Sequence, residues 1–240
     1  MTTFKYSVII PTYNERDNLP IMIFLLDEVF TSHALSYEII IVDDNSQDGT
    51  GAIADALSLH PKWAANLRVL HRSGKLGLGT AYMEGLVLCT GTHIFLMDSD
   101  LSHQSKYIPQ FIATMKSTKC DIVSGTRYQE RGGVIGWSLF RFLTSQVANF
   151  LADTSLGIGQ TDLTGSFRLY ERKTFERIVG KMFSTGYAFQ MEILCRAKEM
   201  GLRVEEVPIV FVERVYQETK FSGGEIKGFL YGVGRLFSYF

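Results

Sequence analysis

Two aspartates separated by one serine follow an apolar segment near the middle of the chain. Residues 93–97 (HIFLM) lead directly into Asp98, Ser99 and Asp100. On a β-strand the side chains of residues i and i+2 point the same way, so both carboxylates would face one small space. A divalent cation would relieve their repulsion, because Mg²⁺ binds carboxylate oxygens, keeps several waters and accepts substrate phosphates as further ligands. The alternative is a solvated acidic turn.

A second acidic group ends another apolar segment. Residues 39–42 lead into Asp43 and Asp44. One interpretation is ordinary turn chemistry, in which Asp48 or Thr50 caps the helix that follows. The other is that a carboxylate at a strand end accepts hydrogen bonds from a nucleobase or a ribose. The pattern alone leaves both open.

Two further motifs have weaker chemical meaning. Residues 74–79 (GKLGLG) begin like a dinucleotide-binding fingerprint, but its third glycine would fall at Tyr82, so the pattern fails. A glycine-rich entry to a helix is the better interpretation, and its N–H groups are candidates for binding a phosphate. His103 lies three residues after Asp100 and is either a further metal ligand or an ordinary loop residue.

Basic residues form the second group of interest. Any one of them alone would be a solvated surface side chain. Arg127, however, ends a predicted strand, and Arg214 and Lys220 follow the last predicted strand. If the basic residues converge, they form a site for a polyanion, because planar guanidinium groups suit phosphate. The set is Arg127, Arg141, Arg168, Arg214 and Lys220.

Short apolar segments alternate with helical patterns in the first half of the chain. The predicted strands are residues 6–10, 37–42, 67–70, 94–97 and 122–124. The predicted helices are residues 19–30, 50–59, 80–88 and 108–117. This alternation predicts an α/β fold with a mostly parallel sheet covered by helices on both faces. Ligands of such sheets bind beyond the carboxyl ends of the strands, where the polar motifs cluster.

The alternation loosens after about residue 127. The segment 137–156 predicts a long amphipathic helix, and the later predictions are a strand at 166–170, a helix at 186–200 and a strand at 204–212. We assign residues 1–222 to one domain. Residues 223–240 are apolar and aromatic, which predicts an amphipathic segment that docks on a membrane or a partner.

Composition narrows the class of protein. A chain of 240 residues with 46% hydrophobic content suffices for one domain with a large core. The net charge of −1 gives no indication of nucleic-acid binding. Cys89, Cys120 and Cys195 are odd in number and far apart, which argues against a disulfide framework or a zinc site and favours a reducing compartment. No run reaches the roughly 18 apolar residues of a membrane span.

Several motifs in series carry a family resemblance. They are VIIPTYNE (8–15), IVDDNSQDGT (41–50), DSDL (98–101), SGTRY (124–128), DLTGSFRLY (162–170) and VPIVFVERVYQETK (207–220). In this order they resemble the family 2 glycosyltransferases with the GT-A fold, and among these the catalytic subunits of dolichyl-phosphate mannosyltransferases. The resemblance runs almost from end to end of the chain.

The resemblance implies a cation site and a catalytic residue in the DSD motif. Asp98 and Asp100 match ligands of Mg²⁺ or Mn²⁺ and of the diphosphate, and Asp100 matches a catalytic position. Ser102 stands where some relatives have a glutamine that also binds the metal, and a water would fill that position. Asp162 stands where other members keep a catalytic base, and we read it as a structural or positioning group.

The resemblance also implies which residues bind the substrates. Those matching contacts with the guanine nucleotide are Pro11, Tyr13, Glu15, Val42, Asp44 and Ser99. Those matching residues that grip the donor phosphate, the mannose or the lipid phosphate, and that we expect to be catalytic, are Arg127, Arg214 and Lys220. Arg141 and Ser145 match residues that hold the acceptor phosphate. Gln217 replaces a glycine common in the family.

The implied reaction is transfer of mannose from GDP-mannose to dolichyl phosphate with inversion, at the cytosolic face of the endoplasmic reticulum membrane. A phosphate monoester has its second pKa near about 6 and is a dianion at neutral pH, so it needs no base. Its product, dolichyl β-D-mannosyl phosphate, is the lipid-linked mannose donor for protein glycosylation and GPI-anchor synthesis. The expected partners are a membrane surface and, as in some relatives, small membrane-anchoring subunits.

Three alternatives remain open at this point. A polyprenyl-phosphate glucosyl or N-acetylhexosaminyl transferase would use a uridine donor in place of GDP-mannose. A sugar nucleotidyltransferase also combines Mg²⁺ with an α/β sheet, but it has a glycine-rich loop where this chain has PTYNE (11–15). A non-catalytic subunit that binds sugar nucleotides would not need the DSD motif.

Overall fold

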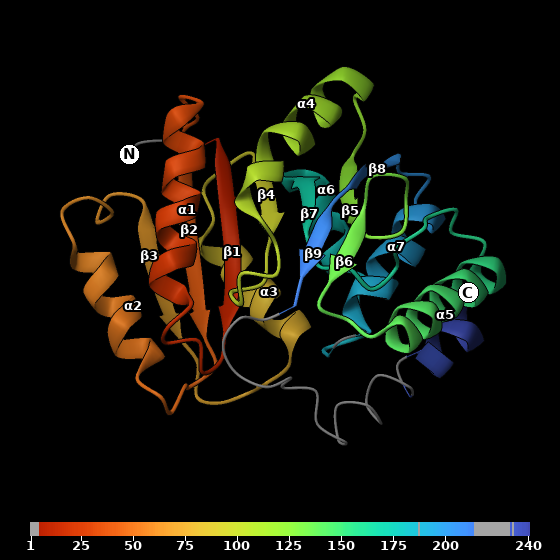
Figure 1. Ribbon diagram of the computed structural model, residues 1–240, viewed down its shortest axis with the longest axis horizontal. Helices are drawn as coiled ribbons and strands as arrows, with labels where there is room; N and C mark the ends of the chain where they lie inside the picture. Colours follow the sequence, from red (N-terminus) through yellow and green to blue (C-terminus); the bar gives the residue numbers. More distant parts are fainter. Residues whose placement is uncertain (1–4, 187, 214–230, 232) are drawn as a thin grey trace.

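A seven-stranded sheet forms the centre of the molecule (Figure 1). The computed structural model describes residues 5–186, 188–213, 231 and 233–240. In spatial order the strands are β3 (Leu67–His71), β2 (Tyr37–Asp43), β1 (Tyr6–Thr12), β4 (His93–Leu96), β7 (Arg168–Glu171), β5 (Ile122–Thr126) and β8 (Val204–Pro208). Neighbours are parallel except at β7, which is antiparallel to β4 and to β5. The predicted mostly parallel sheet is therefore confirmed.

The reversed strand β7 brings a distant part of the chain to the functional edge of the sheet. Leu96 pairs with Arg168, and Phe95 pairs with Leu169. The segment that precedes β7 therefore lies beside the segment that follows β4. A parallel strand at this position would begin at the opposite edge. Residues 162–166 thus reach the edge at which open α/β sheets bind their ligands.

Helices cover both faces of the sheet, as the continuous apolar strands predicted. One face carries α1 (Leu19–Ser32), α2 (Thr50–Leu59) and α4 (Ile108–Thr118), and the other carries α3 (Leu78–Leu88), α6 (Arg172–Val179) and α7 (Phe189–Glu199). Strand side chains alternate between the two: Val8 and Ile10 pack with α1, whereas Ile9 packs with α3. This is the two-residue period of a strand buried on both faces.

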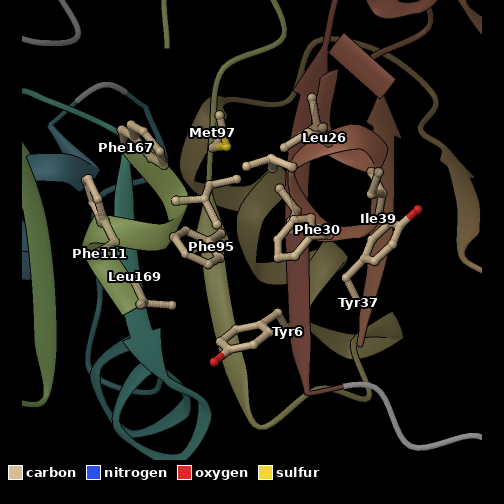
Figure 2. Packing of buried hydrophobic residues seen from close by; sticks show 14 of the residues in the cluster. Tyr6, Leu26, Phe30, Tyr37, Ile39, Phe95, Met97, Phe111, Phe167 and Leu169 are labelled. Atoms are coloured by element: carbon tan, nitrogen blue, oxygen red, sulfur yellow. The ribbon is translucent and has the colours of Figure 1, made fainter. Parts of the chain in front are cut away.

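Aromatic side chains fill the larger core and reach the loop after β4. Phe30 stacks on Tyr37 with ring centroids 4.8 Å apart, and Phe111 stacks on Phe167 at 4.4 Å (Figure 2). Phe167 also stacks on the His103 ring at 5.3 Å. Core packing therefore holds the loop that carries the DSD motif.

The second half of the chain departs from the predicted elements. The single strand predicted at 204–212 is wrong: β8 ends at Pro208, and Val210–Val212 forms β9, which pairs with β6 (Gly133–Ile135) in a separate two-stranded sheet. Ile209 joins the two strands and is buried. Helix α6 and the short 3₁₀ helix Ser105–Tyr107 were not predicted.

The long helix α5 (Leu139–Leu156) packs on the outer side of α7. Residues 233–239 are helical and lie in the same cluster, where Leu236 is fully buried against α5 and α7 (Figure 1). The apolar residues that α5 leaves exposed are Leu139, Phe140, Leu143, Val147, Phe150 and Leu151. Among the described residues no helix has the length and apolarity needed to cross a bilayer. The domain boundary predicted near residue 222 lies outside the described residues.

Candidate functional site

The residues predicted at the nucleotide and the metal, together with Arg127, lie at the carboxyl ends of β1, β2, β4 and β5. Pro11 pairs with Val42 between β1 and β2, and β4 lies on the other side of β1. The hydroxyl of Ser99 donates to the carbonyl oxygen of Pro11 at 3.1 Å, which ties the DSD turn to the end of β1. Three segments that are far apart in sequence therefore meet at one edge.

A tight turn orients the DSD motif. Strand β4 ends at Leu96, so the strand alternation that the sequence suggested does not extend to the aspartates. Leu101 has a φ of +65°, a left-handed conformation that non-glycine residues rarely adopt. This turn directs the N–H of Ser102 to Oδ1 of Asp100 at 3.0 Å. Asp100 is buried, whereas the side chain of Asp98 is 32% exposed and faces solvent in part.

The donor atoms of this turn suit a divalent cation. Asp98, Asp100 and Ser102 offer only oxygen, the donor that Mg²⁺ and Mn²⁺ prefer. Oγ of Ser102 is buried without a hydrogen-bond partner, although buried hydroxyls normally have one. In the described part of the chain no three His, Cys, Asp or Glu side chains cluster as a complete metal site. The residues therefore fit a cation whose remaining ligands are phosphate oxygens and water.

His103 supports the turn. It is buried, and its Nδ1 accepts the backbone N–H of Asp98 at 3.2 Å. Its ring packs between Phe167 and Phe211. His103 is therefore a loop residue that supports the turn, and its Nδ1 is not available to a metal.

The residues predicted to contact the nucleotide differ in which atoms they present at the edge of the sheet. Val42 is fully buried in the core, so it offers only backbone atoms at this edge. Asp43 is occupied by turn contacts, since its carboxylate accepts the Ser46 hydroxyl at 2.5 Å. Asp44 is buried too, and its backbone N–H donates to the carbonyl of Thr12 at 2.9 Å. Asp44 is therefore the carboxylate of this pair that stands apart from the turn.

Arg72, which was not among the predicted site residues, holds Asp44 in place. Its side chain is 1% exposed, and Nη1 donates to Oδ1 of Asp44 at 2.6 Å. The same guanidinium contacts Thr80 and Glu84 on α3. Burial raises the pKa of Asp44, and Arg72 opposes that rise. Arg72 directly follows β3, so its place at the sheet edge was the available signal.

Glu15 and Tyr13 lie in the turn after β1. The backbone N–H of Glu15 donates to the Thr50 hydroxyl at 2.8 Å, and its carboxylate accepts from Asn18 at 2.6 Å. The Lys75 ammonium lies 5.2 Å from the centroid of the Tyr13 ring. The turn after β1 is thereby joined to the start of α2 and to the glycine-rich loop.

Local turn contacts occupy parts of the acidic motif at residues 43–50 and of the glycine-rich motif at residues 74–79. Asp48 accepts the N–H of Thr50 at 2.9 Å, which confirms the predicted turn chemistry. The N-cap of α2 is Gly49 and no side chain caps it, so the predicted capping by Asp48 or Thr50 is wrong. Gly79 donates its N–H to the carbonyl of Thr185 at 2.8 Å, so that group is not free for a phosphate. A side chain at Gly77 would meet the same carbonyl, and φ there is +102°, so glycine is required by close packing.

Arg127 forms a buried, two-point ion pair with Asp162. The Nε–Oδ2 and Nη2–Oδ1 distances are both 2.7 Å, and Nη2 also donates to the Thr164 hydroxyl at 2.8 Å. Burial would raise the pKa of Asp162, but the Arg127 guanidinium outweighs this and holds it below the ordinary value. Asp162 is thus a charged partner of Arg127, in agreement with the positioning role predicted for it.

Aromatic rings connect Arg127 to Arg141. The Trp137 ring centroid lies 5.5 Å from the guanidinium carbon of Arg127 and 4.1 Å from that of Arg141. Arg141 also donates to Glu213 at 2.7 Å. The predicted partner Ser145 shares a hydrogen bond of 2.7 Å with the hydroxyl of Tyr128. Among the described residues predicted for the donor and acceptor phosphates, Arg127, Arg141 and Ser145 therefore belong to one connected cluster.

The five basic residues do not all converge. Arg168 is fully buried and donates to the carbonyls of Gln190 and Leu163 and to the hydroxyl of Ser124, so its predicted place in a polyanion site is wrong. Those hydrogen bonds stabilise the guanidinium charge of Arg168 in the protein interior. Arg214 and Lys220 lie outside the described residues.

Comparison with known proteins agrees with this geometry. The chain is 38% identical to polyprenol monophosphomannose synthase of Mycolicibacterium smegmatis over 96% of its own length and 86% of that protein. It is 36% identical to undecaprenyl-phosphate mannosyltransferase of Micrococcus luteus, over 90% and 87% of the two chains. Glucosyl-3-phosphoglycerate synthase of Mycobacterium tuberculosis has a similar fold, with a TM-score of 0.71 at 17% identity over 98% and 80% of the chains.

The family assignment follows from the motif-bearing part of the sheet. The model of "Glycosyl transferase family 2" matches residues 7–179, which include β1 except its first residue, the DSD turn and the Arg127–Asp162 pair. This covers more than half of the chain and confirms the resemblance of its motifs. The chain belongs to glycosyl transferase family 2 and has its GT-A fold.

Proposed function

We propose that this glycosyltransferase moves mannose from GDP-mannose to the phosphate of a polyprenyl lipid of the dolichyl type, with inversion at the anomeric carbon. The two relatives above 35% identity are named as a polyprenol monophosphomannose synthase and an undecaprenyl-phosphate mannosyltransferase. These names support mannose as the sugar and a polyprenyl phosphate as the acceptor. The same proposal includes dolichyl phosphate as the acceptor and the cytosolic face of the endoplasmic reticulum membrane as the location of the reaction.

The observation that carries the proposal is the ion pair of Asp162. Inverting transfer to a hydroxyl needs a carboxylate that removes a proton. Asp162 stands in the motif where such a base would lie, yet it is fully buried and bound at both oxygens by Arg127. Its pKa lies below the ordinary value, which makes it a still weaker base. An acceptor that is already an anion, such as a phosphate monoester, fits this arrangement.

The basic cluster supplies what an anionic acceptor needs. Two phosphates must approach each other although both are negatively charged. Arg127, bound at two points by Asp162, and Arg141, which lies over the Trp137 ring and donates to Glu213, would place guanidinium groups beside the two phosphates and compensate part of their charge. Preorganised charges of this kind stabilise a transition state without reorganisation during the reaction. Oriented binding adds to this by holding nucleophile and anomeric carbon in line.

A divalent cation held by Asp98, Asp100 and Ser102 would act as a Lewis acid that neutralises charge on the leaving diphosphate. In the structurally similar glucosyl-3-phosphoglycerate synthase, Mn²⁺ and UDP are bound together. For the present chain, Asp44 and the backbone of Val42 would receive the nucleoside, and Arg72 keeps Asp44 in position. The choice of guanine over uracil rests on the resemblance of the motifs, because the names of the two relatives give the sugar and not the nucleotide.

A membrane surface is the proposed location of the reaction, because a long polyprenyl chain does not enter a soluble pocket. The exposed apolar residues of α5 lie on the helix that carries Arg141, so lipid contact and phosphate contact would come from one element. Small membrane subunits remain proposed partners through residues 223–240. The described part of that segment packs on α5 and α7.

The decisive assay uses the purified full chain in detergent or lipid. Labelled GDP-mannose and Mg²⁺ are incubated with dolichyl phosphate, and label is measured in the organic phase; undecaprenyl phosphate and UDP-glucose replace acceptor and donor in parallel. We expect transfer from GDP-mannose and none from UDP-glucose. Asp100→Ala should abolish turnover in a folded protein. Absence of transfer by the wild type with either lipid, also after addition of membrane subunits, would refute the proposal.

A further inference from the structure

Ser166 contacts the more exposed carboxylate of the DSD motif. Its hydroxyl donates to Oδ2 of Asp98 at 2.8 Å. The antiparallel pairing of Leu96 with Arg168 brings the segment after β4 beside the segment before β7, so Asp98 and Ser166 lie just beyond the last pair of the two strands. The reversal of β7 therefore places this hydroxyl at the carboxylate.

The surroundings keep Ser166 in one position. It is buried, and the next residue, Phe167, packs between Phe111 and His103. The carbonyl of Phe167 accepts the N–H of Gly125 at 2.9 Å. A group fixed by packing and by backbone hydrogen bonds can orient its partner at little further cost in entropy.

Asp98 is held at its backbone and at one of its two oxygens. His103 accepts its N–H, and Ser166 occupies Oδ2, which also lies 3.8 Å from Nδ1 of His103. Oδ1 of Asp98 has no hydrogen-bond donor among the residues that the structure describes. Of the two carboxylate oxygens, Oδ2 is therefore the one bound by a protein donor in the described part of the chain.

We propose that Ser166 is a positioning residue for Asp98, which selects Oδ1 as the oxygen offered to the divalent cation. The inference rests on the metal site of the proposed function and adds a residue to it. Groups that hydrogen-bond metal-binding carboxylates orient them, and their loss weakens metal affinity by about 10- to 100-fold. The hydroxyl is the feature that matters, because it is the donor to Oδ2.

The loop formed by residues 162–166 contacts both Asp98, at the proposed metal site, and Arg127, at the proposed phosphate site. Its first residue, Asp162, binds Arg127 at two points, and its last, Ser166, binds Asp98. Thr164 adds a third bond to Arg127. One short loop therefore sets the spacing between Asp98, the proposed metal ligand, and Arg127, the proposed phosphate-binding residue.

The test measures metal binding directly. Free Mn²⁺ is titrated by electron paramagnetic resonance with the full chain in the presence of GDP and, separately, of UDP. Ser166→Ala should weaken Mn²⁺ binding by about tenfold, and Ser166→Thr, which keeps the hydroxyl, should restore most of it. Ser117→Ala removes an exposed serine hydroxyl at the end of α4 and should leave binding unchanged. Thermal unfolding of each variant checks the fold, and Ser166→Cys carries the test if Ser166→Ala does not fold.

The outcomes separate this inference from the proposed function. Equal Mn²⁺ affinity of wild type and Ser166→Ala would overturn the role of Ser166 while leaving a metal-dependent transferase intact. Loss of affinity in both Ser166→Ala and Ser166→Thr would also overturn it, because the hydroxyl would then not be the cause. A wild type that binds no Mn²⁺ with either nucleotide would refute both the positioning role and the metal site.

Discussion

The guanidinium of Arg127 faces the carboxylate of Asp162 in a parallel, two-point contact, with both N–O distances at 2.7 Å and the carboxylate fully buried. Forming such a pair costs free energy, because both charges leave water. Removing one partner costs more, because the other charge would remain buried alone. The pair therefore fixes Arg127 in a single orientation at the edge of the sheet.

Removal of one partner of this pair should strongly destabilise the fold. Asp162→Leu leaves Arg127 charged and unpaired, so we expect a loss of about 3–5 kcal/mol in the free energy of unfolding. The double variant Arg127→Met/Asp162→Leu removes both charges and should regain most of that loss while remaining inactive. Urea denaturation of the variants measures the differences. Glu176→Ala breaks the exposed pair with Arg172 and, as a control, should cost no more than about 1 kcal/mol.

A double variant as unstable as Asp162→Leu alone would show that packing, and not the ion pair, explains the loss. Recovery of activity in the double variant would contradict the role of Arg127 at the donor phosphate. The two results are separable, because stability and transfer are measured on the same preparations.

The same pair should make stability depend on pH in the acid range. The pKa of Asp162 in the folded protein is below the 3.8 of an ordinary aspartate, so the folded state binds fewer protons than the unfolded state. Its contribution is complete above pH 3.8 and is lost as the pH falls through the lower value of the folded protein. The free energy of unfolding of the wild type should therefore fall more steeply below pH 4 than that of Arg127→Met/Asp162→Leu. Parallel slopes would contradict this assignment.

Arg72 should affect the nucleotide more than the chemical step. Arg72→Met leaves Asp44 buried without its partner, and we expect binding of GDP to weaken by about tenfold, or about 1.4 kcal/mol. Arg72→Lys keeps the charge but not the planar fork that reaches Asp44, Thr80 and Glu84 together, so it should restore binding only in part. Calorimetric titration of GDP gives the affinity, and steady-state rates separate KM from kcat. A fall in kcat with unchanged GDP affinity would argue against this role.

The sheet and its motif-bearing edge were predictable because their signals are local. Continuous apolar strands such as residues 37–42 and the Asp98 to Asp100 motif can be recognised without knowing what packs against them. Helix ends differ by only a few residues from those predicted, since the glycine and polar turn residues beside them are also local signals. The predicted turn role of Asp48 is one such case.

The contacts that complete the site depend on long-range topology. Arg127 meets Asp162 across 35 residues, and Ser166 meets Asp98 across 68, because β7 runs antiparallel between β4 and β5. Nothing in the apolar pattern of residues 166–170 indicates that direction. The burial of Arg168 was not predictable for the same reason, because it follows from packing against α7 and not from its sequence neighbours.

Helix α5 should bind lipid surfaces through its exposed apolar residues. Leu139 is 72% exposed on α5, and Leu59, on α2 at the other edge of the sheet, is 79% exposed (Figure 1). Burial of a leucine side chain contributes about 1.5–3 kcal/mol, so Leu139→Ser/Phe140→Ser should reduce binding to anionic phospholipid vesicles by at least about tenfold. Leu59→Ser removes an equally exposed leucine elsewhere and should not. Vesicle co-sedimentation measures the bound fraction, and equal loss in both variants would show that the effect is general hydrophobicity and not the face of α5.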